Sequence, residues 1–151
     1  MQPTRAILAI SAVAALLSLA ACEPEQASAP ATLTRTASPE SASVFFITPM
    51  DGDTVSSPVN IEFGIDGLDI VAAGTDQAQS GHHHLLVDTG LPNLGMPIPA
   101  DAAHIHFGDA STSTELDLEP GDHTLQLLLG DYRHVPHDPP LLSQQIAITV
   151  E

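Results

Sequence analysis

The sequence predicts an all-β domain, on three observations. From Val44 onward, short segments rich in Val, Ile, Leu and Phe recur, separated by turns that contain Gly, Pro or Asp, which is the pattern of strands. No long stretch of this region carries the 3.6-residue apolar period of an amphipathic helix. Residues 44–151 also have the usual length of one domain. We therefore predict a β-sandwich of about seven strands, immunoglobulin-like or fibronectin-like, with a Greek-key barrel as the alternative.

The expected strands follow one another with turn signals between them. Residues 44–47 form a short apolar segment that Thr48-Pro49 ends. Residues 59–65 alternate between apolar and polar types, as a strand with one buried face does. Two long proline-containing loops are expected at 89–103 and 130–140. The expected strands are 44–47, 59–65, 82–88, 104–108, 112–118, 123–129 and 146–150.

The N-terminal segment has the pattern of an export signal. Arg5 precedes an apolar run over residues 6–20, and Leu19-Ala20-Ala21-Cys22 follows. The run is shorter than the ~20 residues of a spanning helix, and it ends in the small residues of a cleavage site. The segment resembles a bacterial lipoprotein signal, which is cut before a cysteine that then carries lipid. We therefore expect residues 1–21 to be removed and Cys22 to anchor the chain to a membrane.

Residues 22–43 are rich in Pro, Ala, Ser, Thr and Glu and contain almost no large apolar residue. Such a segment cannot bury enough apolar surface to fold, so we expect a disordered tether. The tether would carry a single folded domain, residues 44–151. Because Cys22 is the one cysteine of the chain, a lipidated protein would have neither a disulfide nor a thiolate metal ligand.

The charge balance restricts the partners. Nineteen acidic residues stand against three basic ones, for a net charge of −16. Such a surface repels phosphate backbones, so nucleic acid is excluded as a partner, and membrane attachment should depend on the lipid rather than on a basic patch. We expect a bacterial envelope location, facing the periplasm or the exterior. The choice of membrane, the oligomeric state and an envelope protein as partner remain open.

Eight histidines are the unusual feature of the chain. Side chains alternate along a strand, so in residues 82–88 His83 should face the core, while His82 and His84 share the more polar, outward face. His104 and His106 form a second pair of this kind. Residues i and i+2 of a strand lie ~6.6 Å apart and project the same way, so two such pairs on neighbouring strands could bind one metal ion.

Imidazole without thiolate suits zinc(II), copper(II) or nickel(II), of which copper or zinc is the expected ion. His134 and His137 could join the site, since they lie in a loop that prolines stiffen. The structural alternative for these two is a pair of hydrogen bonds to backbone carbonyls. Weaker candidate ligands are His83, His123, Asp88 and Met96.

We therefore expect a membrane-tethered, non-catalytic domain that binds copper or zinc. The alternative is a structural or protein-interaction module of the envelope, whose histidines stabilise the fold or sense pH near 6–7. A metal-dependent hydrolase is a weaker hypothesis, because no catalytic motif accompanies the histidines.

The histidine motifs also resemble a bacterial family. The motifs are Gly81-His82-His83-His84-Leu85-Leu86-Val87-Asp88, Pro97-Ile98-Pro99-Ala100-Asp101, His104-Ile105-His106-Phe107-Gly108, Pro120-Gly121-Asp122-His123-Thr124-Leu125-Gln126-Leu127, Gly130-Asp131 and His134-Val135-Pro136-His137-Asp138-Pro139-Pro140. They are similar to the domain-of-unknown-function family numbered 4399, over nearly all of residues 44–151. The chain departs from that family at 108–115, where a glycine-rich loop is expected. The resemblance implies an exported bacterial protein and no established activity.

Overall fold

The computed structural model describes residues 33–151, and in this range all regular structure is β. The predicted signal peptide and Cys22 lie outside the described residues. Nine strands are present: β1 (Ser43–Thr48), β2 (Thr54–Val55), β3 (Val59–Asp66), β4 (Asp69–Ile70), β5 (Ser80–Val87), β6 (His104–His106), β7 (Ser113–Leu116), β8 (Gly121–Gly130) and β9 (Ile146–Val150).

All seven expected strands are therefore found. The sequence does not predict β2 and β4, because a two-residue strand has no apolar period to read.

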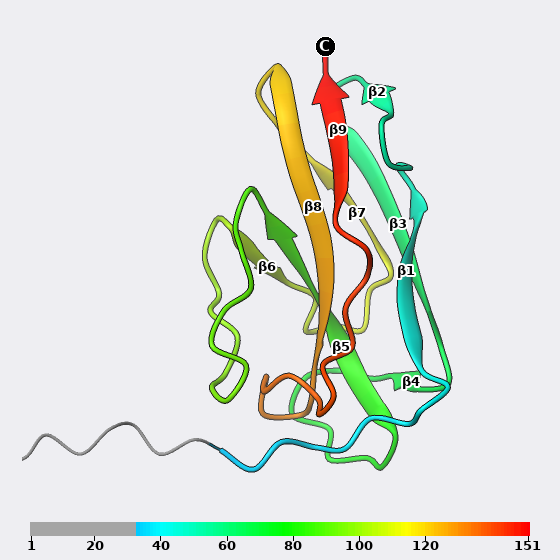
Figure 1. Cartoon of the computed structure of the whole chain (residues 1–151), viewed down its shortest axis with the longest axis vertical. Helices are drawn as coiled ribbons and strands as arrows, with labels where there is room; N and C mark the ends of the chain where they lie inside the picture. The colour runs from blue at the N-terminus through cyan, green and yellow to red at the C-terminus, as the bar shows by residue number, and fades with distance from the viewer. Residues whose placement is uncertain (1–32) are drawn as a thin grey trace, which may run out of the picture. The chain divides into compact units, whose positions relative to one another are not determined.

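The strands form two open sheets. One sheet has the order β1-β3-β7, and the other has the order β2-β9-β8-β5-β4, with β6 also paired to β5. Figure 1 shows β8 and β9 side by side, with β1 and β3 forming the neighbouring layer. Because neither sheet closes on itself, the predicted β-sandwich is confirmed and the barrel alternative is not.

The main core lies between the two sheets and follows the strand period. In β3, residues Val59, Ile61 and Phe63 are buried while the residues between them are more exposed. Leu125 and Leu127 of β8 meet them from the other sheet as members of the same apolar cluster. Burial of each such side chain contributes about 1.5–3 kcal/mol to folding, so this alternation fixes the strand register.

A second buried layer covers the other face of the six-stranded sheet. Every residue of β5 is buried, because the segments after β5 and β8 fold back over it. Leu86 and Leu128 form a separate apolar cluster with Ile98 of the first segment and are packed by Leu142 of the second. The prediction that the even-numbered residues of β5 face outward is therefore wrong. They face away from the main core, yet they lie beneath these loops.

The predicted tether also needs a correction. Residues 33–42, here called the arm, lie along the loop that follows β8. Ala37 forms a parallel bridge with Asp138, and the amide of Leu33 donates to the carbonyl of Gly95. The arm is held by backbone pairing that composition cannot reveal, so the described part of the expected disordered segment is ordered.

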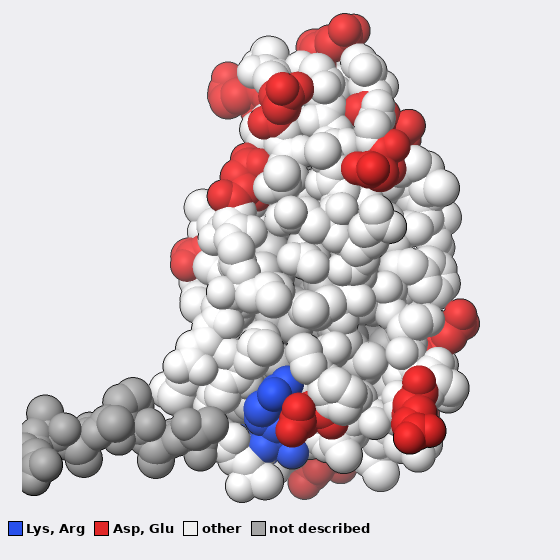
Figure 2. All heavy atoms as spheres, viewed as in Figure 1, with Lys and Arg blue, Asp and Glu red and all other residues white. Residues whose placement is uncertain are grey.

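Acidic and basic side chains of the described residues are distributed differently over the surface. Figure 2 shows acidic side chains scattered over the visible face, with the basic atoms gathered at one place beside the arm. Residues 33–151 contain two basic side chains, Arg35 and Arg133. In this range no helix is long and apolar enough to cross a membrane.

Candidate metal centre

The pairing of β5 with β6 brings two of the predicted histidine pairs together. The strands are antiparallel, with His84 directly opposite His106. Residues that face each other across such a pair project to the same side of the sheet. His82 lies two residues earlier in β5 and shares this side. The sequence left open whether these two strands are neighbours; the structure pairs them, and three imidazoles meet on the outer face of the sheet.

His134 completes the group from the loop after β8. Its ring centroid lies 4.9 Å from that of His82 and 4.8 Å from that of His106. The three strand histidines are spaced alike, since His82 lies 4.8 Å from His84 and 5.0 Å from His106. Four imidazoles from three separate segments thus converge. We call His82, His84, His106 and His134 the histidine cluster.

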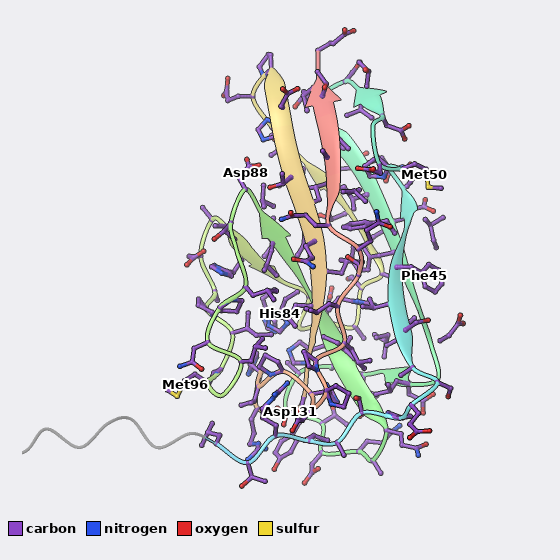
Figure 3. The ribbon with its side chains drawn as sticks, in the orientation of Figure 1. Phe45, Met50, His84, Asp88, Met96 and Asp131 are labelled. Atoms are coloured by element: carbon purple, nitrogen blue, oxygen red, sulfur yellow. The ribbon has the colours of Figure 1, made fainter. Side chains whose placement is uncertain are left out.

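Nitrogen atoms of three cluster histidines lie close enough together to be candidate ligands of one metal ion. One nitrogen from each of His82, His84 and His106 lies within 4.8 Å of the other two. Four nitrogens bound to one ion at 2.0–2.1 Å would lie about 3.3 Å apart, so modest ring movements would close the site. Figure 3 shows His84 near the point where β5 passes behind β8 in this view.

The same nitrogens lack hydrogen bonds. Within residues 33–151, both ring nitrogens of His82, Nδ1 of His84 and Nε2 of His106 are buried without a partner. Buried polar atoms nearly always have partners, so each exception needs an explanation. A metal ion at the centre of the cluster would supply the missing interaction for one nitrogen of each of these three rings.

Two glycines make room for the imidazoles. A Cβ atom at Gly108 would lie 2.4 Å from Cε1 of His106, and one at Gly130 would lie 2.9 Å from Cε1 of His84. Any other residue at these positions would push the rings aside. The sequence signal is visible afterwards, because each glycine lies within five residues of a cluster histidine.

Burial favours the neutral form of His82, His84 and His106. Desolvation, with repulsion from His134 and His106, lowers the pKa of His82 to about 4. Desolvation and the neighbouring histidines lower the pKa of His84 to about 2, and the pKa of His106 is lowered for the same two reasons. Neutral imidazole is the form that binds metal. The titration of His82 and His84 therefore lies below the pH 6–7 range expected of a sensor.

The cluster is buried on one side and open on the other. His82 and His84 are 0% and 1% exposed, whereas His106 and His134 are only partly buried. The two β5 histidines therefore form the floor of the site, and the other two form its rim. An ion would enter past the rim.

Two other candidate ligands, His104 and Met96, lie apart from the cluster. His104 is opposite Leu86 rather than His84, and its Nδ1 donates to Asp101 at 2.8 Å. Met96 lies in the long loop, far from His84 in Figure 3. The structure thus places His104 in a hydrogen-bonded turn, although it shares the strand and the face of His106.

His123 and Asp88 pair with each other at the far end of β5. His123 Nδ1 donates to Asp88 Oδ2 at 2.7 Å, and its Nε2 lies 2.8 Å from the carbonyl oxygen of Glu119. The carboxylate and the carbonyl raise the pKa of His123. Asp88 also accepts from the amide of Thr124. These contacts join the C-terminal end of β5 to the N-terminal part of β8.

The remaining two histidines are buried away from the cluster. His83 faces the main core, as predicted, with its ring centroid 4.7 Å from that of Phe63. His137 is fully buried, and its Nε2 donates to the carbonyl oxygen of Ser80 at 3.2 Å. The carbonyl contact that was the structural alternative for the loop histidines is therefore the one that His137 makes, whereas His134 joins the cluster.

Sequence reasoning does not single out Asp131, which is buried under the same loop. Its Oδ1 accepts from the amides of Arg133 and Val135, which is the hydrogen bonding of an Asx turn. The available signal is an aspartate directly after a strand-ending glycine. Asp131 thus shapes the turn that presents His134.

A family model described as "Domain of unknown function (DUF4399)" matches residues 61–151. The chain belongs to this family. The DUF4399 match includes all eight histidines, both cluster glycines and Asp131. It leaves out the arm, β1 and β2, so the predicted resemblance is confirmed over a shorter range than residues 44–151. Comparisons with curated proteins and with solved structures gave no match.

Proposed function

We propose that this DUF4399 domain binds one divalent transition-metal ion, zinc or copper(II), through the histidine cluster. The observation that carries the proposal is the convergence of three imidazoles, His82, His84 and His106, whose buried nitrogens lack partners within residues 33–151, with the ring of His134 packed against them. Imidazole is a preferred ligand of both ions. Four neutral ligands would give an ion with a full tetrahedral shell, so the proposed activity is binding rather than catalysis.

The same proposal includes attachment to the bacterial cell envelope. It is supported by the apolar run over residues 6–20 and by Leu19-Ala20-Ala21-Cys22, the pattern of a lipoprotein signal. A lipid on Cys22 would hold the domain at a membrane surface, where it would buffer, deliver or sense the ion.

The structural alternative is favoured for three of the other histidines by specific contacts. His104, His123 and His137 each have a hydrogen-bond acceptor, and these bonds join turns and loops to the sheet. We therefore separate the cluster, which binds metal, from His104, His123 and His137, which stabilise the fold. This division determines which variants the experiment compares.

His106 and His104 form a matched pair for that experiment. Both lie in β6, share one face and are partly buried. The purified full chain, His106→Ala and His104→Ala should be titrated with Zn²⁺ and Cu²⁺ by calorimetry. We expect one ion per chain, no change in His104→Ala, and at least about tenfold weaker binding in His106→Ala, since even outer-shell losses cost this much.

Two results would end the proposal. One is that the unmodified chain binds neither Zn²⁺ nor Cu²⁺ more tightly than His106→Ala does. The other is that His104→Ala loses as much affinity as His106→Ala. Thermal unfolding of both variants in chelator checks that each is folded.

A further inference from the structure

The arm and the loop after β8 are joined by an extended set of contacts. The amide of Ser38 donates to the carbonyl of Asp138 at 3.1 Å, and the amide of Asp138 donates to the carbonyl of Thr36 at 2.8 Å. Arg35 reaches the same loop, donating to the carbonyl oxygens of Pro136 and His137. Figure 1 shows the arm running past the base of this loop.

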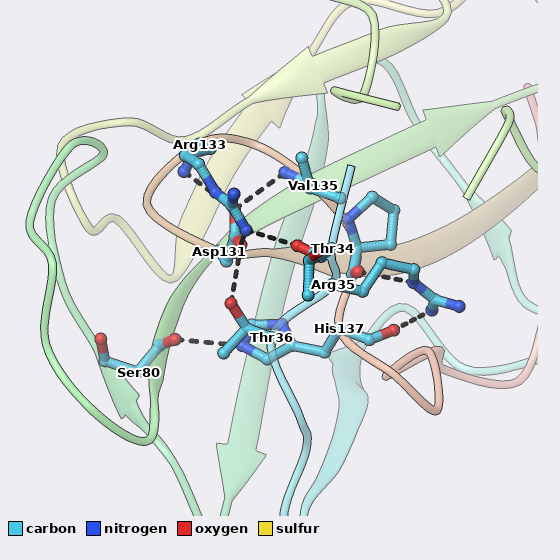
Figure 4. A network of polar contacts seen from close by, with 9 residues as sticks. Thr34, Arg35, Thr36, Ser80, Asp131, Arg133, Val135 and His137 are labelled. Carbon is cyan, nitrogen blue, oxygen red and sulfur yellow. Dashed lines mark hydrogen bonds and ion pairs between the residues drawn. The ribbon is translucent and has the colours of Figure 1, made fainter. Parts of the chain in front are cut away.

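Asp131 is the centre of these contacts (Figure 4). The residue is 1% exposed. Its Oδ2 accepts from Oγ1 of Thr36 at 2.8 Å and from Nη2 of Arg133 at 3.1 Å, and Nη2 of Arg133 also donates to the carbonyl of Thr34 at 2.7 Å. Burial opposes ionisation of Asp131, but the hydrogen bonds that it accepts lower its pKa. The arm thus donates a hydrogen bond to Oδ2 of this buried carboxylate. The loop donates hydrogen bonds to both of its oxygens.

The turn that Asp131 closes is the one that presents His134. The amide of Asp131 donates to the carbonyl of Val135 at 2.9 Å, and the amide of His134 donates to the carbonyl of Asp131 at 2.8 Å. His134 itself has φ +67°, a left-handed conformation that non-glycine residues adopt only when their surroundings impose it. The carboxylate bonds to the turn amides are part of what imposes it.

The positions of the basic side chains also single out the junction between the arm and the loop. In a chain of net charge −16, both basic side chains of the described residues lie at this junction. Arg35 pairs with Asp138 and Arg133 pairs with Asp131. The junction also combines the DUF4399 region with a segment outside the family match. The arm therefore lies outside the family match and contacts the site's loop at its most buried carboxylate.

We infer that the arm controls the metal site, with Asp131 as a positioning residue that aims His134 at the other three imidazoles. This inference rests on the proposed function. When the arm is in place, Thr36 and Arg133 hold the Asp131 carboxylate, and the turn keeps His134 on the rim of the cluster. When the arm leaves, the turn loosens and the site keeps its three strand ligands. By linkage, metal binding must tighten the arm as much as the arm tightens metal binding.

Thr36→Val tests the inference with little change of shape, since it removes one hydroxyl. Thr149→Val is the matched control, because Oγ1 of Thr149 donates to Oδ1 of Asp122 at the same 2.8 Å distance on strands away from the cluster. We expect Zn²⁺ affinity of the full chain to fall about fivefold in Thr36→Val and to stay unchanged in Thr149→Val. Asp131→Asn should cost about 10–100-fold, as outer-shell changes do.

Two further readouts separate positioning from general weakening. In a His134→Ala background, Thr36→Val should have no additional effect on affinity, because the ligand that it positions is gone. Cu²⁺-loaded Thr36→Val should show fewer coordinated nitrogens by pulsed electron paramagnetic resonance. In the unmodified chain, Zn²⁺ should slow amide hydrogen exchange at Ser38 and Asp138.

The outcomes distinguish this inference from the proposed function. If the unmodified chain binds no metal, both are overturned. If it binds metal but Thr36→Val behaves like Thr149→Val, or if Thr36→Val weakens binding equally in the His134→Ala background, only the control by the arm is overturned. Should Asp131→Asn fail to fold, Thr36→Val decides alone.

Discussion

Replacement of His83 tests whether β5 divides its histidines between two faces. The side chain is 0% exposed, and neither ring nitrogen has a partner within residues 33–151. Such an unsatisfied group costs about 1–3 kcal/mol, whereas the edge contact with Phe63 contributes about 0.5–1.5 kcal/mol. Leucine keeps the apolar packing and removes the polar atoms. We therefore expect His83→Leu to raise the free energy of unfolding by about 1 kcal/mol at pH 8.

The gain should be larger in acid. Desolvation lowers the pKa of His83 from 6.5 to about 4. Below pH 6.5 the unfolded chain binds a proton that the folded chain excludes until about pH 4. Stability therefore falls as the pH falls through this window, and His83 causes no further loss below it. At pH 5 the loss is about 2 kcal/mol, so the advantage of His83→Leu should grow to about 3 kcal/mol.

The assay is urea unfolding of the full chain at pH 8, 6.5 and 5, followed by circular dichroism with a chelator present. Zn²⁺ affinity, measured separately at pH 8, should be the same in His83→Leu as in the unmodified chain, because His83 faces the core. An equal effect at pH 5 and pH 8, or a lower stability at both, would refute the account of His83 as a neutral, unpartnered core residue.

Two other predictions follow from single contacts, and a third follows from the predicted lipoprotein signal. Gly108→Ala should weaken Zn²⁺ binding by at least about tenfold, because its Cβ would lie 2.4 Å from Cε1 of His106, whereas Gly90→Ala, with open space around it, should bind normally in the same calorimetric titration. His123 has a raised pKa, so its stabilisation is complete below its unfolded pKa and is lost as the pH rises through the folded pKa. His123→Gln should therefore lower the free energy of unfolding by up to about 1 kcal/mol at pH 5 and by less at pH 8, the opposite pH trend to His83. Cys22→Ser should move the protein from the membrane fraction to the soluble fraction of expressing bacteria, which an immunoblot would show, and equal membrane recovery would contradict lipidation.

The strand pattern predicts the fold well because it is a local property. All seven expected strands are found, and the period correctly places His83 in the core with His82 and His84 on the other face. The same reasoning fails on the burial of that second face. Its cover comes from loops that pack by contacts such as Leu86 with Ile98, and no period in the sequence reports a loop folding back.

The set of ligands was predictable only in part, because it depends on the register in which β5 and β6 pair. Two His-x-His pairs on neighbouring strands look equivalent, but the pairing sets His106 opposite His84 and His104 opposite Leu86. His104 therefore lies two residues further along the ladder, away from His82, and its side chain contacts Asp101 instead. Register depends on the whole sheet, so a single strand's sequence could not choose between the two histidines. The contribution of His134 depends in turn on a left-handed turn that Asp131 closes.

The cluster combines two fixed ligands with two adjustable ones. His82 and His84 are paired with Gly130 and Leu128 of β8 in the centre of the large sheet, so their backbone cannot shift without breaking ladder bonds of the core. His106 lies in a three-residue strand, and His134 lies in a loop. An ion that draws the nitrogens from within 4.8 Å to about 3.3 Å apart must therefore move the latter two. Metal binding should change amide signals near His106 and His134 and leave those of β8 unchanged, and a response spread over the sheet would mean that the floor is not rigid.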